Sequence, residues 1–280
     1  MFNPGGNPLI LQRAEPFNLL PSPKALNPYI LYYNVVFPDG DAFAPQYTLM
    51  PNACGTLSLA FDGRAVIAEL WGASLTPFPL GAEPNRYRAL LLIRLSPYGL
   101  YQITGQDQAE LADKRLSLAD IDAGLFKSLR KAFTTSNTVM DLVRRCDGVF
   151  YSRTEKHVVS DALLCANDLI SERHGQVKVR DVARHACYSE RQLNRFFMTQ
   201  IGTSIKKYAR LARFHYVLSR MQRTPCPFAA LSQQAGYFDQ AHFDKDFKDI
   251  GGVSPQTYLK TSDFYYDGTE VYPIISSKEE

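Results

Sequence analysis

The side chains best suited to chemistry lie in the second half of the chain, in two predicted helices. Their outward sides hold Arg191, Asn194, Arg195, Gln240, Asp244 and Lys245. Arg, Asn and Gln make paired hydrogen bonds to base edges in the major groove, and Lys binds guanine or phosphate. The residue types in this pattern therefore favour recognition of nucleic acid over catalysis.

Each of these helices is preceded by a short helix and a tight turn, so the same unit occurs twice. The first unit spans residues 179–200 and the second spans residues 228–250. Ser189 and Gln192 form a predicted capping box at the start of the longer helix, and Asp239 is the predicted N-cap in the second unit. Apolar residues fill the inner sides, as in a helix-turn-helix whose first helix braces the second in the major groove.

Two runs of residues in this half form a long motif. They are Ala235-Gly236-Tyr237-x-Asp239-Gln240-x-His242-Phe243-x-x-x-Phe247-Lys248 and Gly252-x-Ser254-Pro255-x-x-Tyr258. With Ser189-x-x-x-Leu193-x-Arg195-x-Phe197 upstream, residues 157–260 resemble the DNA-binding domain of the AraC/XylS transcription regulators. The resemblance implies two helix-turn-helix units on one rigid linker helix, predicted here over residues 203–221. Carried over by position, it implies base contacts from Arg191, Asn194, Arg195, Gln240, Ala241 and Lys245.

Three further positions have two interpretations each. His242 either contacts phosphate or packs between helices, and Lys206 and Lys207 form either a solvated face or a phosphate contact. Phe238 stands where the family has a small polar residue, and Lys245 stands where Arg is frequent. Because Lys lacks the two-pronged donor of Arg, the second unit either reads bases or grips only the backbone.

The first hundred residues read as β-structure. Short runs rich in β-branched and aromatic residues, bounded by turn residues, predict strands over 29–37, 56–61, 65–71 and 89–95. Runs such as Trp71-Gly72 and Pro97-Tyr-Gly-Leu100 resemble a cupin-like sensor domain found in some of these regulators. We therefore expect an α+β protein with a cupin-like β-barrel first and an all-α domain second. Apolar stripes in 118–146 predict two helices that cover the barrel or form a dimer interface.

A small-molecule pocket is predicted in the β half. Tyr33, Trp71 and Arg88 are its candidate lining residues, against the alternatives of a barrel core and an exposed strand face. The first histidine of the chain is His157, and no CxxC pair occurs, so neither a metal site, a cofactor nor an enzymatic activity is expected.

Charge divides the chain in the same way. Residues 1–150 carry 13 basic and 13 acidic side chains, whereas residues 151–260 carry 17 basic and 10 acidic ones. A basic half joined to a neutral half is typical of a protein in which one half meets a polyanion. We predict a sensor domain over 1–150, a DNA-binding domain over 151–262 and an acidic tail over 263–280.

These observations predict a cytoplasmic, sequence-specific transcription regulator, with an activator as the form that the resemblance favours. Its expected partners are double-stranded promoter DNA, RNA polymerase in the case of an activator, a small-molecule effector and a second copy of the chain, with no membrane. The alternative is an adaptor that binds another regulator and binds DNA weakly. A steep salt dependence of DNA binding separates the two.

Overall fold

The structure is a computed structural model that describes residues 17–38, 40, 42–153, 157–223 and 226–266. Its first half is built on a six-stranded antiparallel sheet in the order β1-β2-β7-β4-β5-β8. The strands are β1 (Phe17–Pro21), β2 (Ile30–Val36), β4 (Thr56–Phe61), β5 (Val66–Trp71), β7 (Ala89–Leu95) and β8 (Arg115–Ser117). The predicted α+β class is confirmed, and the four predicted strands lie within a residue of their expected bounds.

The predicted closed barrel is wrong, because the sheet is open. Its edges are β1, which pairs with β2, and β8, which pairs with β5. Short strands with alternating apolar residues occur in open sheets and in barrels alike, so the sequence pattern does not separate the two. An open sheet leaves two faces, and each has a different cover.

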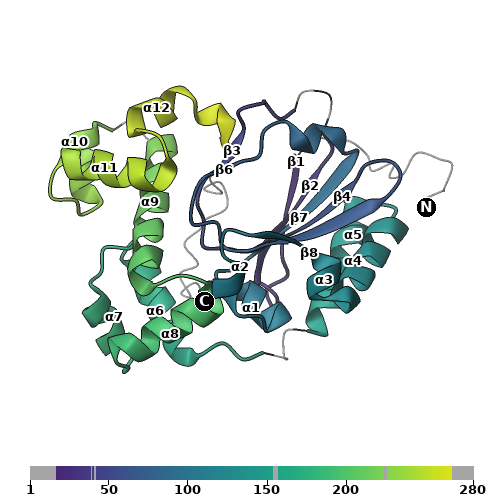
Figure 1. Ribbon diagram of the computed structural model, residues 1–280, viewed down its shortest axis with the longest axis horizontal. Helices are drawn as coiled ribbons and strands as arrows, with labels where there is room; N and C mark the ends of the chain where they lie inside the picture. The colour runs from purple at the N-terminus through teal and green to yellow at the C-terminus, as the bar shows by residue number, and fades with distance from the viewer. Residues whose placement is uncertain (1–16, 39, 41, 154–156, 224–225, 267–280) are drawn as a thin grey trace.

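One face of the sheet packs against three helices, α3 (Leu118–Ile121), α4 (Ala123–Thr135) and α5 (Val139–Tyr151) (Figure 1). Their apolar stripes are buried against the chain's own sheet, which leaves them unavailable for a dimer interface. The first predicted helix is broken at Asp122, whose carboxylate accepts a hydrogen bond from Leu125 N at 2.8 Å and pairs with Arg153. Asp122 therefore caps α4 and ends α3.

The other face carries short elements that lie between the sheet and the second half of the chain. They are β3 (Thr48–Leu49), β6 (Phe78–Pro79) and the 3-10 turn Glu83–Arg86. Helices α1 (Gly99–Thr104) and α2 (Gln108–Leu111) instead bury Leu100, Ile103 and Leu111 in the same cluster as α3–α5. Strand β3 pairs with β6 on one side and, in parallel, with β9 (Tyr265–Tyr266) on the other. The start of the predicted acidic tail is thus a strand, and residues 267–280 lie outside the described part.

Apart from β9, the described residues of the second half are built on helices (Figure 1). Its helices are α6 (Asp161–Glu172), α7 (Val179–His185), α8 (Glu190–Ile201), α9 (Ile205–Arg223), α10 (Phe228–Gln234), α11 (Gln240–Gly251) and α12 (Pro255–Lys260), followed by the 3-10 turn Ser262–Phe264. None of the described helices is long and apolar enough to cross a membrane. Two helix-turn-helix units, α7–α8 and α10–α11, flank the central helix α9 as predicted.

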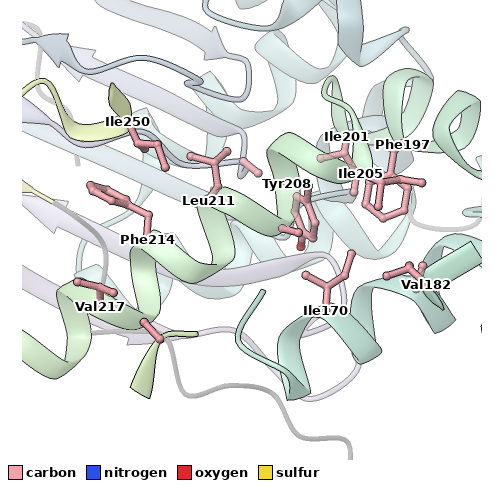
Figure 2. Packing of buried hydrophobic residues seen from close by; sticks show 14 of the residues in the cluster. Ile170, Val182, Phe197, Ile201, Ile205, Tyr208, Leu211, Phe214, Val217 and Ile250 are labelled. Atoms are coloured by element: carbon pink, nitrogen blue, oxygen red, sulfur yellow. The ribbon is translucent and has the colours of Figure 1, made fainter. Parts of the chain in front are cut away.

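Helix α9 is the common core of both units. At one end of α9, Ile205 and Tyr208 lie beside Phe197 of α8 and Ile170 of α6 (Figure 2). Further along the helix, Phe214 lies near Ile250 of α11, in the second unit. All of these side chains are buried. Since a single rigid helix contributes to both cores, the two units are held at a fixed separation.

The two halves share one hydrophobic cluster. Met50 and Ala53, from the loop that follows β3, are buried in the cluster built mainly by α6–α12. In the same loop, the carbonyl oxygen of Pro51 lies 2.8 Å from Nε2 of the buried His215 on α9. The predicted domain boundary lies near residue 150, between α5 and α6. The helical half is nevertheless in contact with residues 50–53, which lie about a hundred residues before that boundary.

Candidate nucleic-acid interface and effector cavity

The first predicted recognition helix, α8, is fixed at both ends. Ser189 Oγ accepts from Gln192 N at 3.3 Å, and Gln192 Oε1 accepts from Ser189 N at 3.3 Å, so the predicted capping box is present. Gly202 ends the helix in the left-handed region with φ of 91°, a conformation that favours glycine. Leu193 and Phe197 are buried underneath.

The outward side of α8 presents two of the three predicted base-reading residues. Arg191 and Arg195 are exposed, one turn apart. Asn194 is half-buried, and its Oδ1 accepts from the backbone N–H of Ile205 at 3.1 Å. The paired contact of Asn with adenine needs both the oxygen and the nitrogen of the carboxamide, so this bond opposes the predicted base contact. Asn194 instead holds the first residue of α9.

The second predicted recognition helix, α11, begins at its predicted cap. Asp239 Oδ1 accepts from His242 N at 2.7 Å. Exposed side chains follow at Gln240, Ala241, His242 and Lys245, and Asp244 is half-buried. The His242 ring also meets Tyr237 edge-on, with ring centroids 5.3 Å apart. His242 thus packs on Tyr237 at the turn, while its contact with a phosphate stays a prediction.

Two aromatic residues lie at the turns, outside the predicted set of DNA-binding residues. Phe238, immediately before the cap of α11, is 92% exposed. Tyr188 is exposed at the matching turn of the first unit and meets Phe196 edge-on at 5.5 Å. An apolar ring beside a recognition helix is suited to a thymine methyl group or a sugar. For Phe238, the signal available in the sequence was its difference from the small polar residue that the family has at this position.

A polar network joins α9 to the second unit. Arg210 donates to Asp246 Oδ1 from Nη2 at 2.5 Å and from Nε at 2.9 Å, and Tyr237 donates to Asp246 Oδ2 at 2.9 Å. Burial beside this carboxylate raises the pKa of Tyr237. On the same helix, Lys206 is exposed and Lys207 is half-buried. Arg210 is therefore committed to a structural pair, while Lys206 and Lys207 stay available to phosphate.

A second candidate site is a cavity of about 600 Å³ on the face of the sheet opposite α3–α5. Alternate residues of each central strand line it, and Trp71 is among them as predicted. The tyrosines that reach it are Tyr32, Tyr47 and Tyr87. Gln222 of α9 and two residues of the 3-10 turn, Ser262 and Asp263, complete its wall, so both halves of the chain contribute.

Two of the three predicted pocket residues lie elsewhere. Tyr33 is buried on the opposite face of the sheet, where its hydroxyl donates to Asp147 Oδ1 at 2.7 Å. Burial raises the pKa of Tyr33, and the bond to Asp147 adds to this effect. Arg88 is exposed, and its guanidinium lies beside Gly63 at a hairpin turn. Because successive residues of a strand face opposite sides, the choice of Tyr33 over Tyr32 selected the wrong face.

A charged cluster forms one wall of the cavity. Arg115 donates from Nη2 and Nη1 to the two oxygens of Glu83 at 2.6 and 2.8 Å, and from Nε to Glu69 Oε2 at 2.6 Å. Its guanidinium lies 4.7 Å from the centroid of the Trp71 ring. The hydrogen bonds from Arg115 hold the pKa of the Glu83 carboxyl below its usual range. Within the described residues no cluster of His, Cys, Asp and Glu is arranged to hold a metal ion.

The helical half is similar in sequence to known proteins. Residues 182–261 match a family described as a helix-turn-helix domain. The arabinose operon regulatory protein of Salmonella typhimurium (strain LT2) is 28% identical over 100 residues, which cover 36% of this chain and 35% of that protein. The HTH-type transcriptional activator AarP of Providencia stuartii is 23% identical over 126 residues, covering 45% of this chain and 91% of AarP.

Among solved structures, ToxT from Vibrio cholerae aligns over 83% of this chain and 93% of its own, with 14% identity and a TM-score of 0.42. The chain spans 35% of the length of the Salmonella relative, so that similarity concerns the helical half. The relatives named here are transcription regulators and not enzymes. Residues 182–261 thus form a helix-turn-helix domain, and the helical half is similar to the matching part of the arabinose operon regulatory protein.

Proposed function

We propose that this protein is a transcription regulator that reads two successive major-groove segments with α8 and α11 and is controlled through its N-terminal half. The observation that carries the proposal is the rigid mounting of two capped helices on α9. This helix has 19 residues, and its length of about 28 Å follows from the helical rise. That length approaches one turn of DNA, about 34 Å, which is the distance between major-groove segments on one face.

Charge and exposure support the same surface. Arg191 and Arg195 on α8, Lys206 on α9 and Lys245 on α11 are exposed basic residues. Cationic side chains that neutralise phosphates release counterions, which provides affinity and a steep dependence on salt. Base contacts from Arg195 and Gln240 then provide sequence preference. An activator of this kind would also contact RNA polymerase when bound at a promoter.

Control by an effector is supported by the loop after β3. Its residues Met50 and Asn52 line the cavity, while Met50 also lies in the hydrophobic cluster of the helical half. Pro51, between them, meets His215 of α9. A molecule that fills the cavity presses on the same loop that packs against the linker helix. Such a molecule shifts α9 only if its binding free energy differs between two positions of this loop, and the size of that difference limits the shift.

The proposal is tested with Arg195→Ala on a DNA site selected from random sequence. We expect the variant to lose about 1–3 kcal/mol of binding free energy on the selected site, because a paired contact to a base is removed. Its affinity for unrelated DNA should fall much less, in a titration followed by fluorescence anisotropy.

The matched control is Arg130→Ala, which removes the same charge from an exposed position on α4, across the sheet from the helical half. This control should leave affinity for the selected site unchanged. Equal losses in the two variants would mean that Arg195 contributes only general charge. Binding that does not weaken as salt rises would exclude DNA as the partner and favour the adaptor.

A further inference from the structure

The floor of the cavity carries a row of four side chains across four strands, and three of them are polar. Neighbouring positions in the register are Asn34 on β2, Leu92 on β7, Ser58 on β4 and Glu69 on β5. All four line the cavity. Apolar and aromatic residues flank this row, and the chain's single tryptophan, Trp71, lies one row away. The cavity is thus apolar overall and carries a few polar groups at defined positions.

Asn34 is the member of this row that lacks a partner. Its side chain is 8% exposed, and none of the described residues donates a hydrogen bond to its Oδ1. Burying an acceptor without a partner costs free energy, and such groups are uncommon in folded proteins. In a cavity wall, this acceptor is placed to receive an O–H or N–H donor from a bound molecule.

Seven charged residues line the cavity, four acidic and three basic, and most of them are hydrogen-bonded within the chain. Glu69 and Glu83 face Arg115, which uses three nitrogens on the two carboxylates, and Arg94 donates to Thr56 Oγ1 at 2.8 Å. A ligand carboxylate or ammonium would lose its hydration and meet charges that are nearly balanced in number. The wall therefore favours a ligand without charge.

From these observations we infer that the cavity binds an uncharged, largely apolar molecule that donates one hydrogen bond to Asn34. The inference deepens the proposed effector control by giving the chemical class of the effector. A volume of about 600 Å³ accommodates a molecule of the size of two fused or linked rings. Its aromatic lining, with Tyr32, Trp71 and Tyr87, suits a flat molecule.

The test uses four compounds that share one skeleton and differ in a single group: 4-biphenylmethanol, 4-methylbiphenyl, 4-biphenylmethylamine and biphenyl-4-carboxylate. Binding to the full chain without DNA is followed by Trp71 fluorescence, which reports from the cavity wall. We expect the alcohol to bind about 3- to 10-fold more tightly than the methyl compound, the range expected of one hydrogen bond. The amine and the carboxylate should bind more weakly than the methyl compound.

Two variants assign the effect to Asn34. Asn34→Leu should bind the alcohol and the methyl compound equally, and it should fold because it replaces an unpaired polar group with an apolar one. Tyr33→Phe, on the opposite face of the same strand, should keep the preference of the original chain. Tighter binding of the carboxylate, a preference retained in Asn34→Leu, or no binding of any compound would overturn the inference. Since DNA is absent, these outcomes are independent of whether the protein reads DNA.

Discussion

At the scale of single residues, two roles compete for the carboxamide of Asn194, a base contact and a cap of α9. Its position on α8, between Arg191 and Arg195, is that of a base-reading residue. Its oxygen, however, accepts from Ile205 N at 3.1 Å and satisfies one of the N–H groups that the first turn of α9 leaves free. Ser204 Oγ accepts from Lys207 N at 3.3 Å and satisfies another. Asn194 therefore belongs to the cap of α9.

This role predicts that Asn194→Ala lowers the free energy of unfolding by about 1 kcal/mol, the usual cost of losing a cap. Asn194→Asp keeps the accepting oxygen and should retain most of that stability, while its negative charge weakens DNA binding. Urea titration of the two variants measures the difference. If Asn194→Ala is as stable as the original chain and loses only base preference, Asn194 is a reading residue.

At the scale of elements, the orientation of α11 on α9 depends on a polar contact as well as on apolar packing. Asp246 is 9% exposed and accepts from both Arg210 and Tyr237. Removing it leaves Tyr237 and a partly covered guanidinium without their acceptor. Because α11 carries the second set of predicted base-reading residues, we expect the same change to loosen the spacing between the two units as well.

Asp246→Ala should therefore lower the free energy of unfolding by about 2–3 kcal/mol. Asp249→Ala is the control, since it removes an exposed carboxylate from the same helix and should change stability by less than about 0.5 kcal/mol. Thermal unfolding followed by circular dichroism at 222 nm, a helix signal, compares the two. Equal melting temperatures for both variants would show that apolar packing alone fixes α11.

Elements whose causes are local could be predicted from the sequence, and placements that depend on distant partners could not. The cap at Asp239 and the capping box at Ser189 need only neighbouring residues, and both are present. The face of the sheet on which a side chain lies depends on the register of its strand, and an error of one residue exchanges the two faces. The prediction named Tyr33, whereas its neighbour Tyr32 lines the cavity. Strand β9 needs β3, which lies more than two hundred residues earlier, and no local pattern indicates that pair.

At the scale of the whole molecule, the two halves are one packed unit in this structure. The cavity, the loop after β3 and α9 are contiguous through Met50 and His215. Helix α2 also lies against the end of α8, where a side chain at Gly202 would collide with Gln108. Both contacts connect the N-terminal half to the elements that mount the recognition helices. The whole chain, rather than its helical half alone, is therefore the unit in which DNA binding is to be measured.

The most direct test of the central claim is the selection of binding sites by the purified full chain from random-sequence DNA. We expect a motif of two conserved blocks with centres about one helical turn, roughly 10 base pairs, apart, because α8 and α11 are fixed to one helix. A single block, or two blocks at variable spacing, would contradict a rigid pair of reading helices. Folded protein that enriches no motif, with or without 4-biphenylmethanol, would contradict sequence-specific reading altogether.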